Sequence, residues 1–331
     1  MKISLRALAV VLSLAAAGTV DAQAAAQNPA LTYPSKPVRV MVGYAPGGGV
    51  DLAARLVASA LSELWGATAL VDNRPGAAGG IATEITAKAT PDGYTLMLCQ
   101  IASHAITPAR STNLPYDHIR DFAFVSMIGS TPNVFVVHPS VPIKSLGEFI
   151  AYAKANPGKL SFGSSGVGAS PHLSIELLKT MTGINIVHVP YKGAAAALAD
   201  VMSGHMESSV GNLAGGPLAA VRSGRVRAIG VTSAQRNAQL PEVPTFAEQG
   251  VKDYEVTGWY GLCTQSRVPQ PVIARINIDM NKLLAGASLK KRLEDQGITV
   301  TPSTPEAFAA HVKAETEKWT KVVREAKLEG D

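Results

Sequence analysis

The chain has 331 residues, of which 47% are hydrophobic and 17% are charged, and its formal net charge is +5. This composition is typical of one or two globular domains with sizeable cores and excludes a disordered chain. The basic residues are scattered and aromatic residues make up only 5% of the chain, so the basic stripe and stacking aromatics of nucleic-acid-binding proteins are absent. We therefore expect no nucleic-acid partner.

The first 26 residues have the pattern of a secretory signal peptide. Lys2 and Arg6 precede an apolar run that ends near Val20, and small residues suited to cleavage follow between Ala22 and Ala26. A membrane-spanning helix needs about 20 apolar residues, and this run is shorter. The pattern predicts that residues 1–26 are a signal peptide and that the mature protein is exported, into the periplasm where the cell has two membranes.

After this segment, strand-like and helical patterns alternate along the chain. The predicted strands are 38–44, 68–73, 93–99, 122–129, 133–139, 159–165, 184–190 and 226–233. The predicted helices are 50–66, 79–89, 145–158, 170–183, 193–204, 217–223, 269–285, 287–296 and 305–327. Strands separated by helices indicate an α/β fold whose sheets are covered on both faces. No flexible linker divides the roughly 300 mature residues, so we expect two domains between which the chain crosses more than once.

Two glycine-rich turns, each between a strand and a helix, are candidates for ligand contact. The first reads GYAPGGGVD, residues 43–51, and the second reads FGSSGVGASPHL, residues 162–173. The first turn is not a dinucleotide fingerprint because Leu52 stands where a third glycine or alanine is needed, and no Walker lysine follows. The second is not a nucleophile elbow because Val167 replaces the last glycine of that motif.

Both turns open a helix, and a helix N-terminus holds anions through its unpaired N–H groups and partial positive charge. Ligands of open α/β sheets lie beyond the carboxyl ends of the strands. The residues alone leave two interpretations open: two ordinary strand–helix turns, or two facing turns that clamp a small anion between two lobes. The seven histidines form no ligand pair, and we expect neither a metal nor a cofactor.

The two cysteines, Cys99 and Cys263, both lie in apolar segments. An oxidising compartment would allow them to form a disulfide. Two lone cysteines in strand-like runs are more often small buried hydrophobic residues, which is the interpretation we favour while the disulfide stays open.

Eight motifs, taken together and in order, resemble the Bug receptors, which are periplasmic substrate-binding proteins associated with tripartite tricarboxylate transporters. They include GYAPGGGVD, VDNRPGAAGGIA, YAKANPGKLSFGSSGVGASPHL, VHVPYKGAAAALAD and LPEVPTFAEQGVKDYEVTGWYG, and the match runs from about residue 33 to residue 327. The resemblance implies a two-lobed periplasmic binding protein of the type II-like Venus-flytrap kind. Each lobe would be a mixed, mainly parallel sheet flanked by helices. Lobe 1 would contain residues 33–131 and 256–331, and lobe 2 residues 132–255.

The resemblance also implies a receptor without enzyme activity, acting as a monomer. It would bind a small organic carboxylate mainly through backbone amides and bridging waters, and deliver it to membrane transporter subunits. The positions that match the family's binding residues are Tyr44, Gly47, Gly48, Gly49, Asp51, Ser103, His104, Ser164, Ser165, Gly166, Gly168, Tyr191, Lys192, Gly193 and Asn212. Among these, Asp51 is expected to cap the helix and order the first turn rather than to touch a negative ligand.

Three positions depart from the family's pattern and bear on the ligand. Tyr44 stands where phenylalanine is usual and would add a hydroxyl donor, Val50 replaces a common hydroxyl residue, and Arg110 replaces an apolar residue. Two other functions stay open at this point. A ligand-sensing subunit of a membrane signalling system, partnered by a sensor kinase, would use the same cleft. An exported serine hydrolase would use Ser164 or Ser165.

Overall fold

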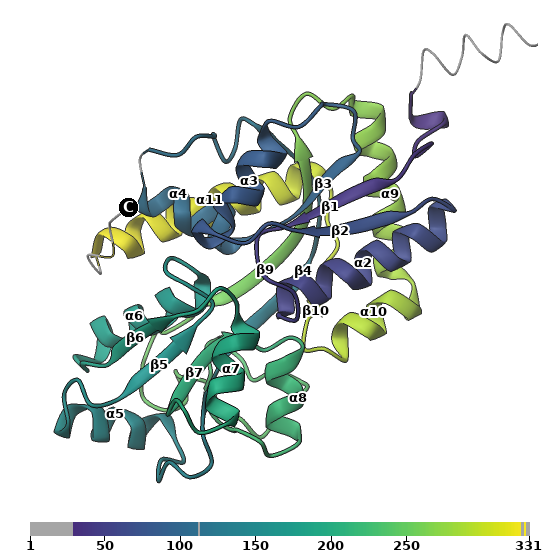
Figure 1. The fold of residues 1–331 in the computed structure, drawn as a ribbon. Coiled ribbons are helices and arrows are strands. Elements are labelled where there is room, and N and C mark those ends of the chain that lie inside the picture. Colours follow the sequence, from purple (N-terminus) through teal and green to yellow (C-terminus); the bar gives the residue numbers. More distant parts are fainter. Residues whose placement is uncertain (1–28, 112, 326–327, 329–331) are drawn as a thin grey trace, which may run out of the picture.

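The computed structural model describes residues 29–111, 113–325 and 328 (Figure 1). The predicted signal peptide therefore lies outside the described residues. Within the described ranges, no helix is both long and apolar enough to cross a membrane.

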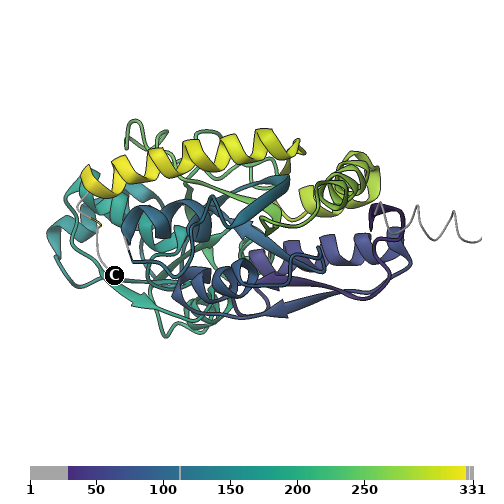
Figure 2. The ribbon, with the colours of Figure 1, turned by 90° about the horizontal axis from the view of Figure 1, so that it is seen from above.

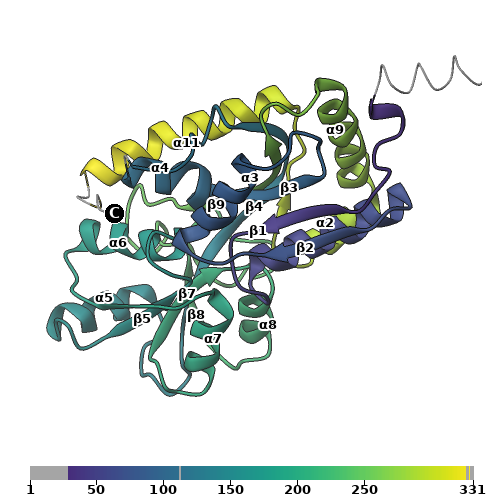
Figure 3. The same cartoon turned by 45° about the horizontal axis from the view of Figure 1, so that its top comes forward.

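The strands and helices form two halves that share the strand β4, Phe122–Val137. The first half contains η1 Pro29–Leu31, β1 Val38–Val42, α2 Gly49–Trp65, β2 Ala69–Asn73, η2 Ala77–Gly79, α3 Gly80–Ala87, β3 Thr95–Gln100, the π-helix η3 Ala102–Ile106, α4 Thr107–Arg110, β9 Thr257–Gln265, α9 Gln270–Ala285, α10 Ala287–Glu294, β10 Thr299–Val300 and α11 Pro305–Glu325. The second half contains α5 Leu146–Ala155, β5 Ser161–Ser164, α6 Ser170–Thr182, β6 Val187–Pro190, α7 Ala194–Met202, β7 Ser208–Asn212, α8 Gly216–Arg222 and β8 Arg227–Val231. Figure 3 shows the two halves one above the other, with β4 and β9 near their junction.

The strands pair in the order β2-β1-β3-β9-β4-β7-β5-β6, with β10 and β8 paired to β4. The pairs β1–β2, β1–β3, β5–β6 and β5–β7 are parallel, while every pair that includes β4 or β9 is antiparallel. Along β4 the partner changes from β9 at Pro132 to β7 at Asn133. The sheet in each half is therefore mixed, and a single strand passes from one half to the other.

The continuous strand β4 differs from the two strands, 122–129 and 133–139, predicted from the sequence. Gly129 and Pro132 are residues that often end a strand, which is why the pattern indicates a break there. In the structure Gly129 instead lies against β10, where an added Cβ would be 2.3 Å from the Thr299 carbonyl oxygen. Glycine at this position permits the close approach of β10, and the strand continues. The strands β7 and β9 are not among the predicted elements.

The first half buries both faces of its sheet. On one face Val38, Val40 and Val42 of β1 pack in a cluster with α2, α9 and α10. On the other face Met41 joins a cluster with α3, η3 and α11, and Figure 2 shows α11 running along that side of the molecule. The alternation of Val40, Met41 and Val42 between two clusters is the period of two expected for a strand buried on both sides.

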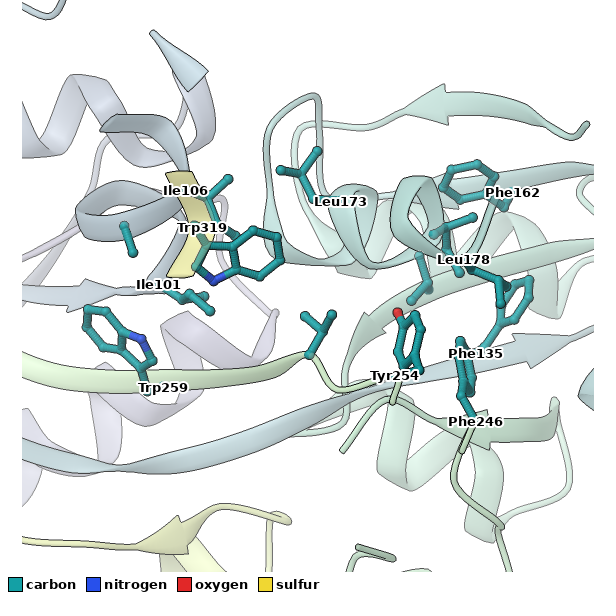
Figure 4. Packing of buried hydrophobic residues seen from close by; sticks show 14 of the residues in the cluster. Ile101, Ile106, Phe135, Phe162, Leu173, Leu178, Phe246, Tyr254, Trp259 and Trp319 are labelled. Carbon is teal, nitrogen blue, oxygen red and sulfur yellow. The ribbon is translucent and has the colours of Figure 1, made fainter. Parts of the chain in front are cut away.

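One hydrophobic cluster runs through both halves (Figure 4). Trp259 and Trp319 of the first half lie at one end, and Phe135 and Tyr254 lie at the other. Leu173 of α6 lies near Trp319, and its side chain is only 1% exposed. The two halves are thus packed against each other in this structure.

Candidate functional site

Three neighbouring pockets lie between the halves, and residues of both halves line each one. The inner pocket is small, with a cavity volume of about 10 Å³, room for about one water molecule, and is lined by Tyr44, Ala45, Gly48, Gly49, Val50, Gln100, Ser165, Ser170, Pro171, Ala194 and Asn212. The middle pocket, about 360 Å³, is lined by Gly43, Tyr44, Pro75, Gly76, Ala77, Ala78, Ser165, Gly166, Val167, Tyr191 and Lys192. The outer pocket, about 570 Å³, is lined by Ala77, Ala78, Thr107, Arg110, Ser111, Asn113, Leu114 and Val167. Shared lining residues connect the inner pocket to the middle one and the middle one to the outer one.

Three helices begin at the inner pocket. The N-cap residues of α2, α6 and α7 are Gly48, Ala169 and Gly193, and none of them makes a side-chain capping bond. Glycine and alanine have no side-chain oxygen, so the first N–H groups of these helices are not satisfied in the way that serine or aspartate would satisfy them. The helices have 17, 13 and 9 residues, and each contributes a partial positive charge at its start. The arrangement favours a bound anion.

The first turn is ordered by the buried carboxylate of Asp51, which is 3% exposed. Its Oδ2 accepts bonds from the Gly47 N–H at 3.0 Å and from Arg55 Nε at 2.9 Å, and its Oδ1 accepts a bond from Asn73 Nδ2 at 2.9 Å. Burial by itself raises the pKa of Asp51, but the bonds from Arg55, Gly47 and Asn73 bring that pKa below its ordinary value. Asp51 is the third residue of α2 and not its N-cap, so it fixes the loop from inside the helix.

Tyr44 connects the first turn to a second loop of the same half. Its hydroxyl donates to the Ala78 carbonyl at 3.1 Å and accepts from Gln100 Nε2 at 3.2 Å. The sequence suggests that this hydroxyl is a donor for the ligand, but in the structure its proton is already used within the protein. Gln100, which sequence reasoning missed, lines the inner pocket beside it.

The loop 75–79 forms a wall of the middle pocket and was also missed as a site. Ala77 and Ala78 have φ values of 47° and 51°, in the left-handed region that non-glycine residues seldom adopt. The loop is pressed against the end of β1, because a Cβ on Gly43 would lie 2.4 Å from the Gly79 Cα. Strained backbone of this kind gathers at binding sites. The signal available in the sequence was the motif RPGAAGG, whose glycines indicate an unusual loop without indicating what it faces.

The second turn presents Ser165 to both the inner and the middle pocket, and Gly166 to the middle pocket. Behind them, Ser164 is fully buried, and its Oγ lies 2.7 Å from His188 Nε2. The N–H of Gly168 donates to His172 Nδ1 at 3.2 Å.

Two stacked imidazoles support this second turn. The rings of His172 and His188 are 4.0 Å apart between centroids. Burial, with smaller contributions from the neighbouring His188 ring and from the cations Arg110 and Lys179, lowers the pKa of His172 to about 3. Burial and Lys179 lower the pKa of His188 to about 4. Both rings are therefore neutral at pH 7.

The remaining residues of the second half complete the cleft. Tyr191 and Lys192 line the middle pocket, and the hydroxyl of Tyr191 donates to Asp200. Lys192 is exposed and forms no ion pair with any residue in the described ranges. Gly193 begins α7, and a Cβ there would lie 3.3 Å from that of Ala45 in the first turn. Asn212 lines the inner pocket, and its Nδ2 donates to Asn133 Oδ1 at 3.0 Å.

The structure thus brings most of the predicted residues to one cleft. Those lining the inner or middle pocket are Tyr44, Gly48, Gly49, Ser165, Gly166, Tyr191, Lys192 and Asn212. Those behind the pocket walls are Gly47, Asp51, Ser164, Gly168 and Gly193. Ser103 and His104 do not join them: both are fully buried and line none of the three pockets.

His104 instead belongs to a buried group with both cysteines. One ligand atom each from Cys99, His104 and Cys263 lies within 4.8 Å of the others, and both cysteines are free thiols. Burial raises the pKa of the Cys263 thiol and lowers the pKa of His104 to about 3. Neutral sulfur and imidazole atoms can pack in a core without an ion, and the His104 ring lies 4.7 Å from that of Phe122. The sulfur and nitrogen atoms would suit a soft metal, but they lie outside the three pockets.

Comparison with known proteins gives a consistent result. A family model described as "Tripartite tricarboxylate transporter family receptor" matches residues 53–328. The protein BugT of Bordetella pertussis is 34% identical over 295 residues, which cover 89% of this chain and 90% of BugT.

Three solved structures extend this similarity to the fold. Rpa4515 of R. palustris, solved with adipate, is 34% identical with a TM-score of 0.85, over 89% of this chain and 98% of its own. The periplasmic binding protein BugD is 30% identical with a TM-score of 0.86, over 90% of this chain and 100% of its own. MatC of Rhodopseudomonas palustris, solved with malate, is 28% identical with a TM-score of 0.83, over 88% of this chain and 100% of its own.

Proposed function

The chain belongs to the tripartite tricarboxylate transporter receptor family, which includes the Bug proteins, and from that premise we propose that it captures a small organic carboxylate between its two halves, with the carboxylate group at the inner pocket and the rest of the ligand in the middle pocket. It acts in the periplasm, to which residues 1–26 direct it, and delivers the ligand to the membrane subunits of a tripartite transporter. It acts as a receptor and not as an enzyme.

The observation that carries this proposal is the meeting of three uncapped helix N-termini, those of α2, α6 and α7, at one pocket. A carboxylate there accepts bonds from N–H groups that have no side-chain cap. A second observation also supports binding of a polar ligand group at the inner pocket. The hydroxyl of Tyr260 is buried without a hydrogen-bond partner in the described structure, and it lies 3.2 Å from where a Cβ on Gly49 would be.

The chemistry of the pocket also favours binding over turnover. Its side-chain polar groups are those of Tyr44, Gln100, Ser165, Ser170 and Asn212, all of them neutral. Backbone N–H groups and neutral side chains can hold and orient an anion, and a bridging water extends their reach. The two relatives solved with adipate and malate carry ligands of this chemical class.

We further propose that the lobes are residues 33–131 with 256–331, and residues 132–255. The change of partner along β4 between Pro132 and Asn133, and the start of β9 at Thr257, support these boundaries. The chain then crosses between the lobes within β4 and again just before β9, and bending at these two crossings would open and close the cleft around the ligand.

The proposal is tested by thermal unfolding of the mature chain with a library of carboxylates, sugars and nucleotides. A ligand at 100 times its dissociation constant adds about 2.7 kcal/mol to the free energy of unfolding, which is easily measured. We expect at least one mono- or dicarboxylate to raise the melting temperature while sugars and nucleotides do not. Stabilisation by a sugar, with no effect from any carboxylate, would contradict the proposal.

One observation favours a second candidate, an exported hydrolase. The Oγ of Ser164 is 2.7 Å from His188 Nε2, as in a nucleophile–base pair. However, Ser164 is fully buried and lines none of the three pockets, and no carboxylate among the described residues bonds to His188. Hydrolysis of p-nitrophenyl acetate that disappears in Ser164→Ala would favour the hydrolase over the receptor.

A further inference from the structure

The outer pocket contains a cation that the inner pocket does not use. Arg110 is the last residue of α4, and Figure 3 shows α4 of the first half above α6 of the second half. Its Nη1 lies 2.7 Å from where a Cβ on Gly168 would be, so the guanidinium lies beside the turn of the opposite half. The glycine at position 168, with φ of 77°, leaves the space that this side chain occupies.

Among the described residues, no acid pairs with Arg110. Its Nε donates to the Leu328 carbonyl at 2.9 Å, and the ion pairs of the described ranges do not include it. Arginine stays protonated at any physiological pH and carries five N–H donors, and in the described part of the chain this is the one hydrogen bond that its guanidinium donates. Partial burial of a charge is costly unless a partner of opposite sign is supplied.

The middle pocket adjoins both the inner pocket and the outer pocket that contains Arg110, and its lining is largely apolar. The middle and outer pockets share the walls formed by Ala77, Ala78 and Val167. Val167 is 53% exposed, which is unusual for an aliphatic side chain of this size, and Leu114 adds a further apolar surface beside Arg110. The cleft therefore has hydrogen-bond donors at both ends and a hydrocarbon lining between them.

We propose that Arg110 forms a second anion subsite and that the ligand is a dicarboxylate with an extended aliphatic chain. This inference rests on the proposed function, because the first carboxylate is placed at the three helix N-termini of the inner pocket. The methylene groups lie against Ala77, Ala78 and Val167, and the second carboxylate accepts hydrogen bonds from the guanidinium. Such a geometry discriminates against monocarboxylates, since they leave the charge of Arg110 unpaired in a closed cleft.

The test measures the affinities of the mature protein for adipate, for its monoamide adipamate and for hexanoate by calorimetry. The three probes have the same number of carbons in the chain and differ at one end. Succinate and suberate are added to find the chain length that spans the two ends. The variants are Arg110→Leu, which removes the charge, and Arg110→Lys, which keeps it with fewer donors. Circular dichroism and the melting temperature of each variant without ligand show whether the fold is retained.

We expect the wild type to bind the best dicarboxylate at least tenfold more tightly than hexanoate. Arg110→Leu should abolish this preference while changing hexanoate affinity less than threefold, and Arg110→Lys should retain part of it. A preference for dicarboxylates that is unchanged in Arg110→Leu overturns the subsite but leaves the receptor function in place, as does an equal loss for all three probes. Absence of binding to any carboxylate by the folded wild type overturns the proposed function and the subsite together.

Discussion

The two glycine-rich turns at the cleft are positioned by different chemistry. The first turn, 43–51, is held by its own ionised carboxylate, Asp51, which accepts three hydrogen bonds. The second turn, 162–173, is held by the neutral rings of His172 and His188 and by a buried hydroxyl, that of Ser164. Both turns nevertheless do the same thing, which is to present the start of an uncapped helix to one pocket.

This difference determines which substitution or pH change destabilises each turn. A buried ionised group gives strong and directional bonds but leaves several unpaired donors when it is removed. Neutral imidazoles add no charge to the turn, but they no longer stabilise it when acid protonates them. The two turns should therefore respond differently to substitution and to pH, although both are needed for the same cleft.

The largest effect is expected for Asp51→Ala. The substitution leaves the Gly47 N–H and the Asn73 amide without their acceptor, and both lie partly buried. Arg55 contributes less, because half of its side chain is exposed and water can solvate it. We expect the free energy of unfolding to fall by about 3 kcal/mol in urea denaturation.

The control for this prediction is Asp72→Ala. Asp72 pairs with Arg39 and Arg74, whose side chains are about half exposed, and its loss should cost less than about 1 kcal/mol. Because the pKa of Asp51 is lowered in the folded protein, its contribution is present above the ordinary value near 4 and is lost as the pH falls below it. Equal destabilisation by the two substitutions would show that the first turn does not depend on its carboxylate.

The second turn should instead lose stability between pH 6.5 and pH 4. The pKa of His172 is about 3 in the folded protein and about 6.5 in an unfolded chain, so below pH 6.5 only the unfolded state takes up a proton. At pH 5 this difference removes about 2 kcal/mol of stability. In His172→Gln the fall in stability from pH 7 to pH 5 should shrink by about that amount.

The control substitution is His205→Gln, which changes an exposed histidine outside the second turn. Measuring melting temperatures of the three proteins from pH 8 to pH 4 makes the comparison. If His172→Gln unfolds with the wild-type pH profile, the imidazole pair is not what distinguishes the second turn from the first.

At the pocket itself, Gly48→Pro should weaken carboxylate binding at least tenfold. Gly48 has a φ of −88°, close to the range of proline, so the main change is the loss of one N–H at the start of α2. A hydrogen bond to a charged group contributes about 1.5–3 kcal/mol, and a factor of ten corresponds to about 1.4 kcal/mol. Calorimetry with the carboxylate found in the thermal screen measures the loss.

Gly48→Ala keeps the N–H, and nothing lies within 4 Å of the added Cβ, so it is the matched control. We expect this variant to lose less affinity than the proline variant. The reverse order would mean that space at Gly48, and not its N–H, is what the ligand needs.

The smallest effect is expected for Lys192→Ala. Lys192 lines the middle pocket but is exposed, so water solvates its charge before and after binding. Affinity for the same carboxylate should fall by less than tenfold. A larger loss than in Gly48→Pro would show that a side-chain ion pair, and not the helix N-termini, holds the ligand.

The sequence by itself predicted the local features of this protein. The helices α2, α6 and α7 begin within one residue of their predicted starts at 50, 170 and 193, because glycine, proline and hydrophobic periodicity act over a few neighbouring residues. Gly48, Gly49 and Ser165 were proposed as site residues because they match positions of the family's motifs, and they line the inner pocket. The order of the motifs also predicted the family and the α/β fold, which the comparisons confirm.

Only the tertiary structure decided how distant segments meet. It made β4 continuous through Gly129, placed the loop 75–79 beside Tyr44, and put His104 in the core next to Cys263. It also brought Arg110 to Gly168, 58 positions away in the chain. In each of these contacts, the sequence around one residue does not indicate which distant residue it will meet. They form because the packing of two sheet faces and a shared strand fixes positions that local propensity cannot specify.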